Sequence, residues 1–443
     1  MTARRFRPYP SYKDTGIEWL GKIPEQWGVK RLKYAAVIVA GQSPPSNAVS
    51  SDGEGLPFLQ GNAEFGPRHP SPQFVCDTVP KRAEEGDFLL SVRAPVGALN
   101  TAERKYGIGR GLCAIRPTEV MEKGYAFYLL LAVRGALDVV ATGSTFEAVA
   151  AGDVGGLPSV QPPLPEQRSI AAFLDRETQR IDTLVEKKER LVELLHERRT
   201  ALISHAVTKG LDPNVRMKDS GVEWLGKIPE HWRTGLKLSY LAVSRRGAFT
   251  NGPFGSDLLT TELVGSGVPV IYIGDIGTEG YCRARDRFVT KGKAIELDAF
   301  RVDPGDVLIA KVGDPPGFAC VYPDTEPPGV VTQDVVRIKV RQSLSRPRYL
   351  SMLLNSSYGG ALVDLICVES TRNRFSFGDY RGIRIALPPV AEQDAIADYL
   401  DRETKRIDAM LEKVRRSVEL LKEYRTALIS AAVTGKIDVR DAA

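Results

Sequence analysis

Two long stretches of this sequence are nearly the same. Residues 166–208 read EQRSIAAFLDRETQRIDTLVEKKERLVELLHERRTALISHAVT, and residues 392–434 read EQDAIADYLDRETKRIDAMLEKVRRSVELLKEYRTALISAAVT. Twenty-nine of these 43 positions are identical, at an offset of 226 residues. A shorter repeat joins residues 13–27 (KDTGIEWLGKIPEQW) to residues 218–232 (KDSGVEWLGKIPEHW), with 12 of 15 positions identical at an offset of 205. The chain therefore contains an internal repeat, which decides its organisation.

The segments between the repeats differ in length and in sequence, because the offset grows by 21 residues from one repeat to the next. Some landmarks are shared, since residues 86–90 (GDFLL) correspond to residues 305–309 (GDVLI). The chain is therefore a short framing motif, a variable domain and a long helix, and then the same three parts again.

The long repeats predict helices that begin near Glu166 and Glu392, because prolines precede both and no Pro or Gly follows until Gly210 and Gly435. Apolar residues recur every seven positions, with one interruption at Lys188. This spacing is typical of a coiled-coil seam. The predicted seam residues are Leu174, Ile181, Leu195, Leu202, Leu400, Ile407, Val414, Leu421 and Leu428. The second register of the seam is predicted at Ile170, Leu184, Leu191, Ile396, Met410 and Tyr424.

Each helix could pack on its own domain alone, but two matching stripes of equal length favour pairing of the two helices with each other. The internal repeat makes that pairing antiparallel. About 38 helical residues would form a rod of roughly 57 Å at 1.5 Å per residue. We therefore expect an α/β (α+β) protein with a pseudo-two-fold internal repeat, in which two mixed α/β domains are joined by an antiparallel coiled coil.

Composition excludes several classes of protein. The 443 residues carry a net charge of +5, which permits an acidic partner such as DNA without requiring one. The five cysteines show no paired spacing, so we expect a reduced, cytoplasmic protein without a structural zinc. The longest apolar run, residues 125–133, is too short to cross a membrane, and we expect no membrane partner.

The order of these motifs resembles that of a known protein family. The order W-L-G-x-I-P-x-x-W, then a variable domain, then a Pro-rich stretch before a helix ending in R-T-A-L-I-S, occurs twice. This arrangement is similar to the specificity (S) subunit of type I restriction–modification systems and covers nearly the whole chain.

The resemblance implies two target-recognition domains, each reading one half of a bipartite DNA site. It implies two modification (methyltransferase) subunits that use S-adenosylmethionine, and a restriction (motor-nuclease) subunit that uses ATP and Mg²⁺. It implies no cofactor in this subunit.

The same sequence argues against catalytic alternatives. A DNA methyltransferase with a fused recognition domain needs an [N/D]-P-P-[Y/F/W] loop around the flipped base. Residues 251–254 (NGPF) and 314–317 (DPPG) each lack one element of it, and residues 107–111 (GIGRG) fit a turn better than a cofactor loop. The carboxylate–lysine run at 186–188 lies on a predicted helix, so it does not favour a nuclease. A purely structural coiled coil would leave the variable domains unexplained.

Bases are read by polar side chains, and phosphates are held by Lys and Arg. We expect both kinds in loops that follow apolar runs, with one amphipathic helix per domain near residues 125–141 and 348–367. The candidates in the first domain are Gln60, Asn62, Arg68, Arg93, Ser144 and Thr145. Those in the second are Tyr272, Asp275, Lys311, Thr371, Arg372, Asn373 and Arg374.

The repeats also give domain boundaries. The framing motifs are predicted at residues 1–27 and 211–232, and the target-recognition domains at 28–157 and 233–383. The first coiled-coil helix is predicted at 158–210, and the second helix with its C-terminal tail at 384–443.

Overall fold

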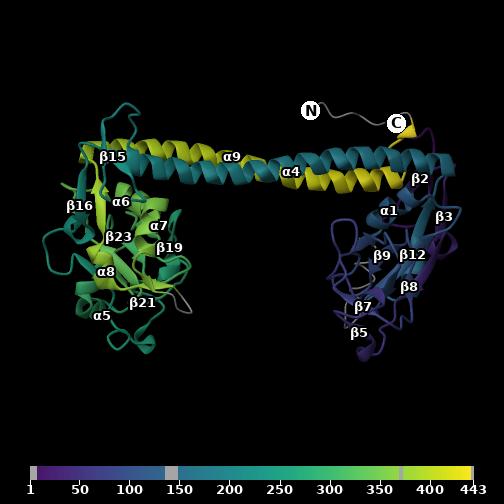
Figure 1. Ribbon diagram of the computed structural model, residues 1–443, viewed down its shortest axis with the longest axis horizontal. Helices are drawn as coiled ribbons and strands as arrows, with labels where there is room; N and C mark the ends of the chain where they lie inside the picture. Colours follow the sequence, from purple (N-terminus) through teal and green to yellow (C-terminus); the bar gives the residue numbers. More distant parts are fainter. Residues whose placement is uncertain (1–6, 135–147, 369–372, 441–443) are drawn as a thin grey trace. The chain divides into compact units, whose positions relative to one another are not determined.

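The computed structural model describes residues 7–134, 148–368 and 373–440, and they fall into two compact units (Figure 1). Unit 1 contains residues 1–189 and 415–443, and unit 2 contains residues 190–414. Unit 1 thus joins the beginning of the chain to its end. Each unit contains one variable domain and a part of each long helix.

The two long helices are α4 (Leu164–Lys209) and α9 (Val390–Val433). They begin within two residues of the predicted positions, and Glu166 and Glu392 lie in their first turns, where carboxylates are favoured by the helix dipole. Each helix is followed within two residues by a glycine with positive φ, 77° at Gly210 and 69° at Gly435. Because only glycine adopts this conformation without strain, the two residues fix where the helices stop.

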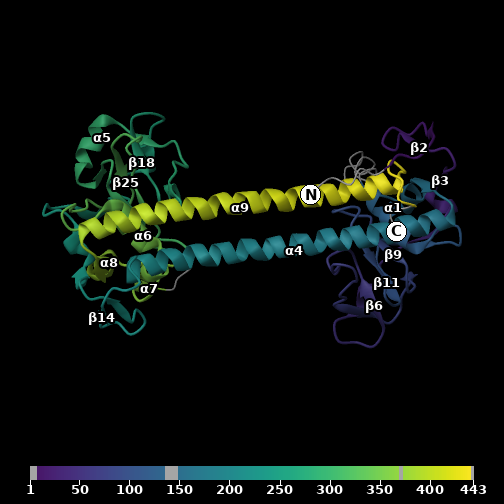
Figure 2. The same cartoon turned by 90° about the horizontal axis from the view of Figure 1, so that it is seen from above.

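The helices pair antiparallel within each unit, as Figures 1 and 2 show, so the predicted coiled coil is confirmed. In unit 1, Arg425 of α9 pairs with Asp182 of α4, with Nε and Oδ1 2.8 Å apart. In unit 2, Arg199 of α4 pairs with Asp408 of α9 at 3.1 Å. The two pairs occupy equivalent repeat positions with the helices exchanged, as in a two-fold symmetric interface.

All nine predicted seam residues are buried or half-buried. The second register, however, was wrong at three positions, because Leu191, Met410 and Tyr424 are 42%, 52% and 49% exposed. The neighbouring residues Leu411 and Val418 are buried instead. Positions three and four residues along a helix both lie near the same stripe, so the partner helix, and not the spacing alone, selects between them.

The variable domain of unit 1 is built from two sheets. A four-stranded antiparallel sheet has the order β10-β9-β12-β4, and a five-stranded sheet has the order β5-β7-β6-β11-β8. The strands are β4 (Ala36–Ala40), β5 (Val49–Ser50), β6 (Leu56–Leu59), β7 (Phe74–Cys76), β8 (Arg82–Ala83), β9 (Phe88–Ser91), β10 (Leu99–Thr101), β11 (Tyr106–Ile108) and β12 (Leu112–Pro117).

Unit 2 repeats this plan. Its sheets have the orders β17-β26-β23-β24 and β21-β18-β25-β22. The strands are β17 (Phe249–Asn251), β18 (Val268–Ile271), β21 (Phe288–Val289), β22 (Arg301–Val302), β23 (Val307–Ala310), β24 (Ala319–Val321), β25 (Gly329–Val331) and β26 (Val335–Ile338). In each domain one pair is parallel, β6 with β11 and β18 with β25, so the two diverged sequences form one fold.

Short hairpins and helices complete each unit. The framing motifs form the hairpins β1 (Tyr12–Asp14)–β2 (Lys22–Pro24) and β14 (Met217–Asp219)–β15 (Lys227–Pro229). The chain enters and leaves each variable domain on one strand pair, β3 (Gly28–Arg31) with β13 (Pro158–Gln161) and β16 (Arg233–Lys237) with β29 (Arg384–Leu387). The other α-helices of the described residues are α1 (Lys123–Ala132), α3 (Ala151–Gly156), α5 (Lys291–Glu296), α6 (Pro347–Asn355), α7 (Ser357–Asp364) and α8 (Phe377–Gly382), and the other strands are β19 (Ile276–Gly277), β20 (Gly280–Tyr281), β27 (Cys367–Val368) and β28 (Arg374–Phe375).

The predicted single helix at residues 348–367 was wrong, because two helices, α6 and α7, meet at Ser356. The Ser356 hydroxyl accepts the amide N–H of Gly359 and caps α7, which a hydroxyl side chain does well. In unit 1, α1 ends at Ala132, and the rest of the helix predicted at 125–141 lies largely outside the described residues.

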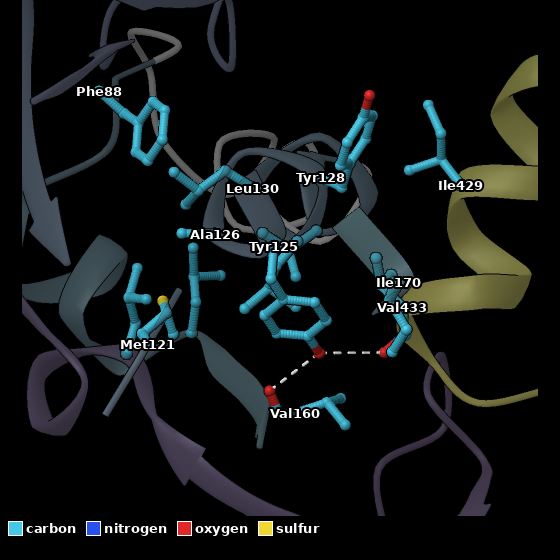
Figure 3. Packing of buried hydrophobic residues seen from close by; sticks show 14 of the residues in the cluster. Phe88, Met121, Tyr125, Ala126, Tyr128, Leu130, Val160, Ile170, Ile429 and Val433 are labelled. Carbon is cyan, nitrogen blue, oxygen red and sulfur yellow. Dashed lines mark hydrogen bonds between the residues drawn. The ribbon is translucent and has the colours of Figure 1, made fainter. Parts of the chain in front are cut away.

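A buried tyrosine fastens each variable domain to the helix pair. In unit 1, the Tyr125 hydroxyl lies 3.0 Å from the carbonyl oxygen of Val160 and 3.3 Å from that of Val433, at the end of α9 (Figure 3). Burial raises the pKa of Tyr125 well above its usual value, so the hydroxyl keeps its proton and remains a donor. Tyr349 does the same in unit 2, where its hydroxyl lies 3.4 Å from the carbonyl of Val207, near the end of α4.

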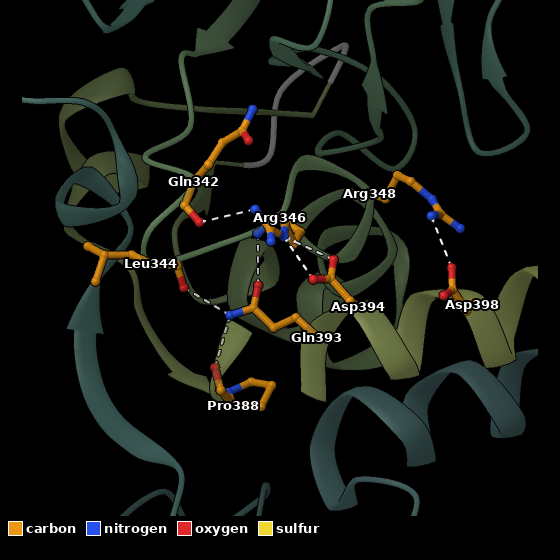
Figure 4. A network of polar contacts seen from close by, with 8 residues as sticks. All are labelled: Gln342, Leu344, Arg346, Arg348, Pro388, Gln393, Asp394 and Asp398. Carbon is orange, nitrogen blue, oxygen red and sulfur yellow. Dashed lines mark hydrogen bonds and ion pairs between the residues drawn. The ribbon is translucent and has the colours of Figure 1, made fainter. Parts of the chain in front are cut away.

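A buried glutamine provides a second fastening, and Figure 4 shows it in unit 2. The side chain of Gln393, fully buried at the start of α9, accepts the N–H of Arg346 and donates to the carbonyls of Leu344 and Pro388, all at 2.9 Å. Gln167 makes the same three bonds in unit 1, to Glu122, Val120 and Pro162.

The framing motifs are held to the same helix ends. The ring N–H of Trp27 donates to Glu166 at 3.0 Å, and that of Trp232 donates to Glu392 at 3.1 Å. Both rings are almost fully buried. The sequence E-Q at the start of each helix therefore binds the framing motif through the glutamate and the variable domain through the glutamine.

Gln393→Met should loosen unit 2, because a similar side-chain volume is kept while three buried backbone groups lose their partner. The expected loss is about 3 kcal/mol at about 1 kcal/mol per unpaired group. Amide hydrogen exchange should accelerate in α6, whereas Gln179→Met, at an exposed position of α4, should change little. Unchanged exchange in the Gln393→Met protein would contradict the assigned role.

Candidate nucleic-acid interface

The parallel strand pair of each variable domain brings two loops together. In unit 1, β6 and β11 end side by side, and the N–H of Gly109 donates to the Leu59 carbonyl at 2.8 Å. In unit 2, β18 and β25 end in the same way, and Thr332 donates to Ile271 at 3.0 Å. Loops at the carboxyl ends of adjacent parallel strands commonly form binding sites.

The loops after two further strands reach the same place. In unit 1, Gln42 after β4 donates its N–H to Ile108, and Val92 after β9 donates to Gly111, both at 2.9 Å. The counterparts in unit 2 join Gly252 to Val335 at 3.2 Å and Lys311 to Asp334 at 2.8 Å. We call this surface the four-loop edge. It comprises residues 41–43, 60–62, 92–93 and 109–111 in unit 1, and residues 251–254, 272–273, 311–313 and 332–334 in unit 2.

Several predicted DNA-binding residues lie at the four-loop edge. In unit 1 these are Gln60, whose amide donates to the Ser43 hydroxyl at 3.0 Å, the half-buried Asn62 and the exposed Arg93. In unit 2 they are Tyr272 and Lys311, and the segment with Asn373 and Arg374 joins them. That segment is fixed by the N–H of Gly313, which donates to the Asn373 carbonyl at 3.1 Å, and by a bridge between Val312 and Arg374. The predicted residues Ser144, Thr145, Thr371 and Arg372 lie outside the described residues.

Arg68 does not join the edge. Its carbonyl accepts the N–H of Thr101, which pairs with Phe88 at the start of β9, whereas Arg93 follows the end of that strand. The Arg68 side chain instead lines a cleft beside Asp175 and Asp182 of α4. The loop between β6 and β7 therefore leads Arg68 away from the loops that follow the strands.

The prediction that Asp275 reads a base is also corrected. Its side chain is 1% exposed, and its carboxylate accepts the N–H groups of Tyr272 and Ala284, both at 2.8 Å. With both oxygens used in this way, Asp275 shapes the turn after β18 and is not free to read a base. Burial raises the pKa of the neighbouring Tyr272, and the guanidinium of Arg285 lies 5.5 Å from the centre of its ring.

The structure adds residues that the sequence analysis missed. Gln42 and Arg110 are exposed at the edge of unit 1. At the edge of unit 2, Gln333 is exposed, Phe254 is 67% exposed, and the Asn251 amide donates to the Gln333 carbonyl at 3.4 Å. Residues 107–111 and 251–254 contribute to these edges, although their sequences alone resemble incomplete catalytic motifs.

Two glycines allow the loops to approach so closely. A Cβ atom on Gly41 would lie 2.1 Å from the Gly109 carbonyl oxygen, and one on Gly252 would lie 2.2 Å from the Thr332 carbonyl carbon. The two glycines hold equivalent positions, directly after β4 and β17. Each edge therefore depends on a backbone contact that any larger residue would open.

The edges carry the side chains that contact DNA in general. Guanidinium, amide, ammonium and phenol groups dominate, and these bind phosphates and base edges. The edge of unit 2 also carries the exposed carboxylate of Asp334. Among the described residues there is no group of three or more side chains able to hold a metal ion, and no helix is long and apolar enough to cross a membrane.

Comparison with known proteins agrees with this geometry. Residues 24–194 match the family described as the type I restriction modification DNA specificity domain. The putative type I restriction enzyme MjaX specificity subunit of Methanocaldococcus jannaschii is 37% identical over 204 residues, which are 45% of this chain and 46% of that protein, so the chain matches about half the length of that relative. The MjaVIII specificity subunit of the same organism is 22% identical over 433 residues, which are 95% of each protein.

Solved structures show the same fold. The HsdS subunit from Thermoanaerobacter tengcongensis is 18% identical with a TM-score of 0.54, over 94% of this chain and 98% of that one. A chain from a study of complex assembly and conformational transition of the type I R-M system is 19% identical with a TM-score of 0.71, over 93% and 98%.

The fold is repeated in the two units, and each unit carries a variable domain with one four-loop edge. Residues 24–194 thus match a type I restriction modification DNA specificity domain, and the whole chain is similar in sequence and fold to specificity subunits of type I restriction enzymes.

Gly252→Ala should separate the loops of the unit 2 edge, because the added methyl group would overlap the backbone of Thr332. Amide exchange at residues 332–335 should rise, and the unfolding temperature should fall by several degrees, as for a clash of about 1–3 kcal/mol. Gly255→Ala is the matched control, since its Cβ would meet no atom within 4 Å. Equal behaviour of the two proteins would contradict the close packing of this edge.

Proposed function

We propose that this chain directs a type I restriction–modification complex to a bipartite, non-palindromic DNA site, with each target-recognition domain reading one half. The observation that carries the proposal is that one loop arrangement, the four-loop edge, is built twice on nearly identical frames. The backbone hydrogen bonds that join the loops are equivalent in the two edges, whereas the exposed side chains differ. Surfaces that keep the same loop positions but carry different side chains can recognise different base sequences.

The two edges differ enough to read different sequences. The edge of unit 1 presents two glutamines, Gln42 and Gln60, with Arg93 and Arg110. The edge of unit 2 presents aromatic rings and a different set of polar groups, with Asn251, Phe254, Tyr272, Lys311 and Gln333. Glutamine and asparagine match adenine, and arginine matches guanine, whereas aromatic groups contact methyl groups and stacked bases. Unlike edges predict unlike half-sites.

Catalysis belongs, in this proposal, to the partner proteins. The sequence holds no intact methyltransferase or nuclease motif, so the chain itself needs no cofactor. Two modification subunits would supply S-adenosylmethionine chemistry, and a restriction subunit would supply ATP- and Mg²⁺-dependent cleavage. We place the complex in the cytoplasm, where such partners and their DNA substrate meet.

The outer faces of the long helices support binding of two identical partners. Arg176, Arg180 and Leu194 of α4 are exposed, and so are their repeat equivalents Arg402, Arg406 and Leu420 of α9. Neither exposed leucine is part of the coiled-coil seam. Burial within this chain therefore does not explain why both repeats carry a leucine at this position. A partner that binds each copy of the surface does explain it.

The proposal is tested by mapping methylated adenines in DNA from cells that carry the complete system. Arg110→Ala should relax or change only the half-site read by unit 1, and Gln333→Ala only the other half-site. Loss of one direct base contact should lower discrimination at that base pair by about 10- to 100-fold, as expected for about 1–3 kcal/mol.

Lys237→Ala, an exposed basic residue away from the edges, is the control and should leave the methylated sequence unchanged. The chain alone, given S-adenosylmethionine and DNA, should transfer no methyl group. Methylation by the chain alone, or a change in both half-sites from either edge variant, would refute the proposal.

A further inference from the structure

Unit 2 contains a second basic surface, apart from its four-loop edge. It is a cleft of about 240 Å³, which we call the basic cleft. Five cationic residues line it, namely Arg245, Arg246, Arg301, Arg337 and Lys339, against two carboxylates, Asp298 and Asp303. The loop that lines the cleft ends at Gly247, just before β17. The four-loop edge begins at Asn251, the last residue of β17. The four residue steps from Gly247 to Asn251, the last three residues of which form β17, span about 13 Å at about 3.3 Å per residue.

Arg337 is the unusual member of the cleft. It is 2% exposed on β26, and its terminal nitrogens donate only to the backbone carbonyls of Arg301 and Gly247. Its Nε atom is buried without a hydrogen-bond partner in the part of the chain that the structure describes. Carbonyl groups are dipoles and do not neutralise a charge, so a buried guanidinium held in this way is stabilised by a nearby anion.

The carboxylates near the cleft are largely used by other cations. Asp303 pairs with both Arg301, at 2.7 Å, and Lys339, and Asp306 lies 3.2 Å from the Lys339 ammonium. The pKa of Arg337 is lowered, chiefly by burial and further by the like charge of Arg245, although Asp306, Asp303 and Asp298 act in the opposite direction. The residues that line the cleft comprise five cations and two carboxylates, and with Asp306 beside Lys339 an excess of two positive charges remains.

The first domain lacks this feature. In unit 2, Arg337 pairs with Leu308 of β23 and with Thr250 of β17. In unit 1, the equivalent residues Leu89 and Val39 both pair with Ala114. Ala114 is fully buried among apolar residues. The common fold therefore does not require an arginine here. The positive charge is an addition peculiar to unit 2, and it occurs together with the exposed pair Arg245 and Arg246.

We propose that the basic cleft binds a phosphate group. Guanidinium groups hold phosphate oxygens in pairs, and the exposed Arg245 and Arg246 can close over an anion that the buried Arg337 attracts. The phosphate can come from the backbone of a DNA duplex held at the four-loop edge, since the separation of about 13 Å is close to the width of the major groove, about 12 Å. It can also be free inorganic phosphate. Only the DNA source rests on the proposed function.

The first arm of the test uses inorganic phosphate and the full-length chain. Phosphate should raise the unfolding temperature by about 2 °C relative to chloride at equal pH and ionic strength, as expected when its concentration exceeds the dissociation constant several-fold. The double variant Arg245→Ala with Arg246→Ala should lose this shift. The double variant Lys237→Ala with Lys291→Ala removes the same charge from exposed positions outside the cleft and should keep it.

The second arm measures how binding of a duplex depends on salt. The logarithmic slope changes by about 0.9 for each phosphate contact. The Arg245/Arg246 variant should therefore reduce the slope by about 1 more than the Lys237/Lys291 control does. A reduced slope with no phosphate shift assigns the ligand to duplex DNA, and a phosphate shift with an unchanged slope assigns it to free phosphate.

Loss of neither property in the Arg245/Arg246 variant would overturn the proposal. Arg337→Met provides a second check where it folds, as judged by circular dichroism, and it should lose the same property as the double variant. Retention of that property would exclude the buried guanidinium from the site. The phosphate arm does not depend on base reading, so its outcome stands whatever adenine mapping shows.

Discussion

The antiparallel pairing of α4 and α9 is the constraint on which the rest of the structure depends. The seam buries apolar residues such as Leu174, Leu400 and Leu428, and each fully buried leucine contributes about 1.5–3 kcal/mol. The ion pairs Asp182–Arg425 and Arg199–Asp408 are partly exposed to solvent and contribute little energy, but they fix the register because each arginine meets the aspartate of the other repeat. The last part of α9 completes the core of unit 1, which includes Leu428 and Val433.

The contacts that attach each variable domain to the helix pair leave the sequence of its exposed loops free to vary. The same three devices recur in each unit: a glutamine that satisfies three backbone groups, a tyrosine hydroxyl at the end of the other helix, and a framing tryptophan on the glutamate that opens the helix. None of these devices involves the four-loop edge. Side chains at the edge can therefore change without weakening the frame, which explains how two strongly diverged sequences share one fold.

Much of this fold could be predicted from the sequence, because the heptads and the repeat are local patterns. The helix limits followed from prolines and from Gly210 and Gly435, and the pairing followed from two equal stripes. The choice between Met410 and Leu411 could not be made, since both lie near the stripe and only the partner helix decides. The four-loop edge was predicted only in part, because it arises from parallel pairing between β6 and β11, whose ends are about fifty residues apart in the chain. Asp275 was misjudged because a polar residue after a strand can serve the backbone as well as a ligand.

An exchange of the two recognition domains tests most directly whether they are interchangeable and attach to equivalent positions of the helix pair. Residues 28–157 and 233–383 would be swapped within one chain, leaving both framing motifs and both helices in place. Methylated adenines would then be mapped in cells carrying the partner subunits. The account predicts the two original half-sites in reversed order. A folded, active complex that still methylates the original sequence, or that recognises half-sites unrelated to either original, would contradict it.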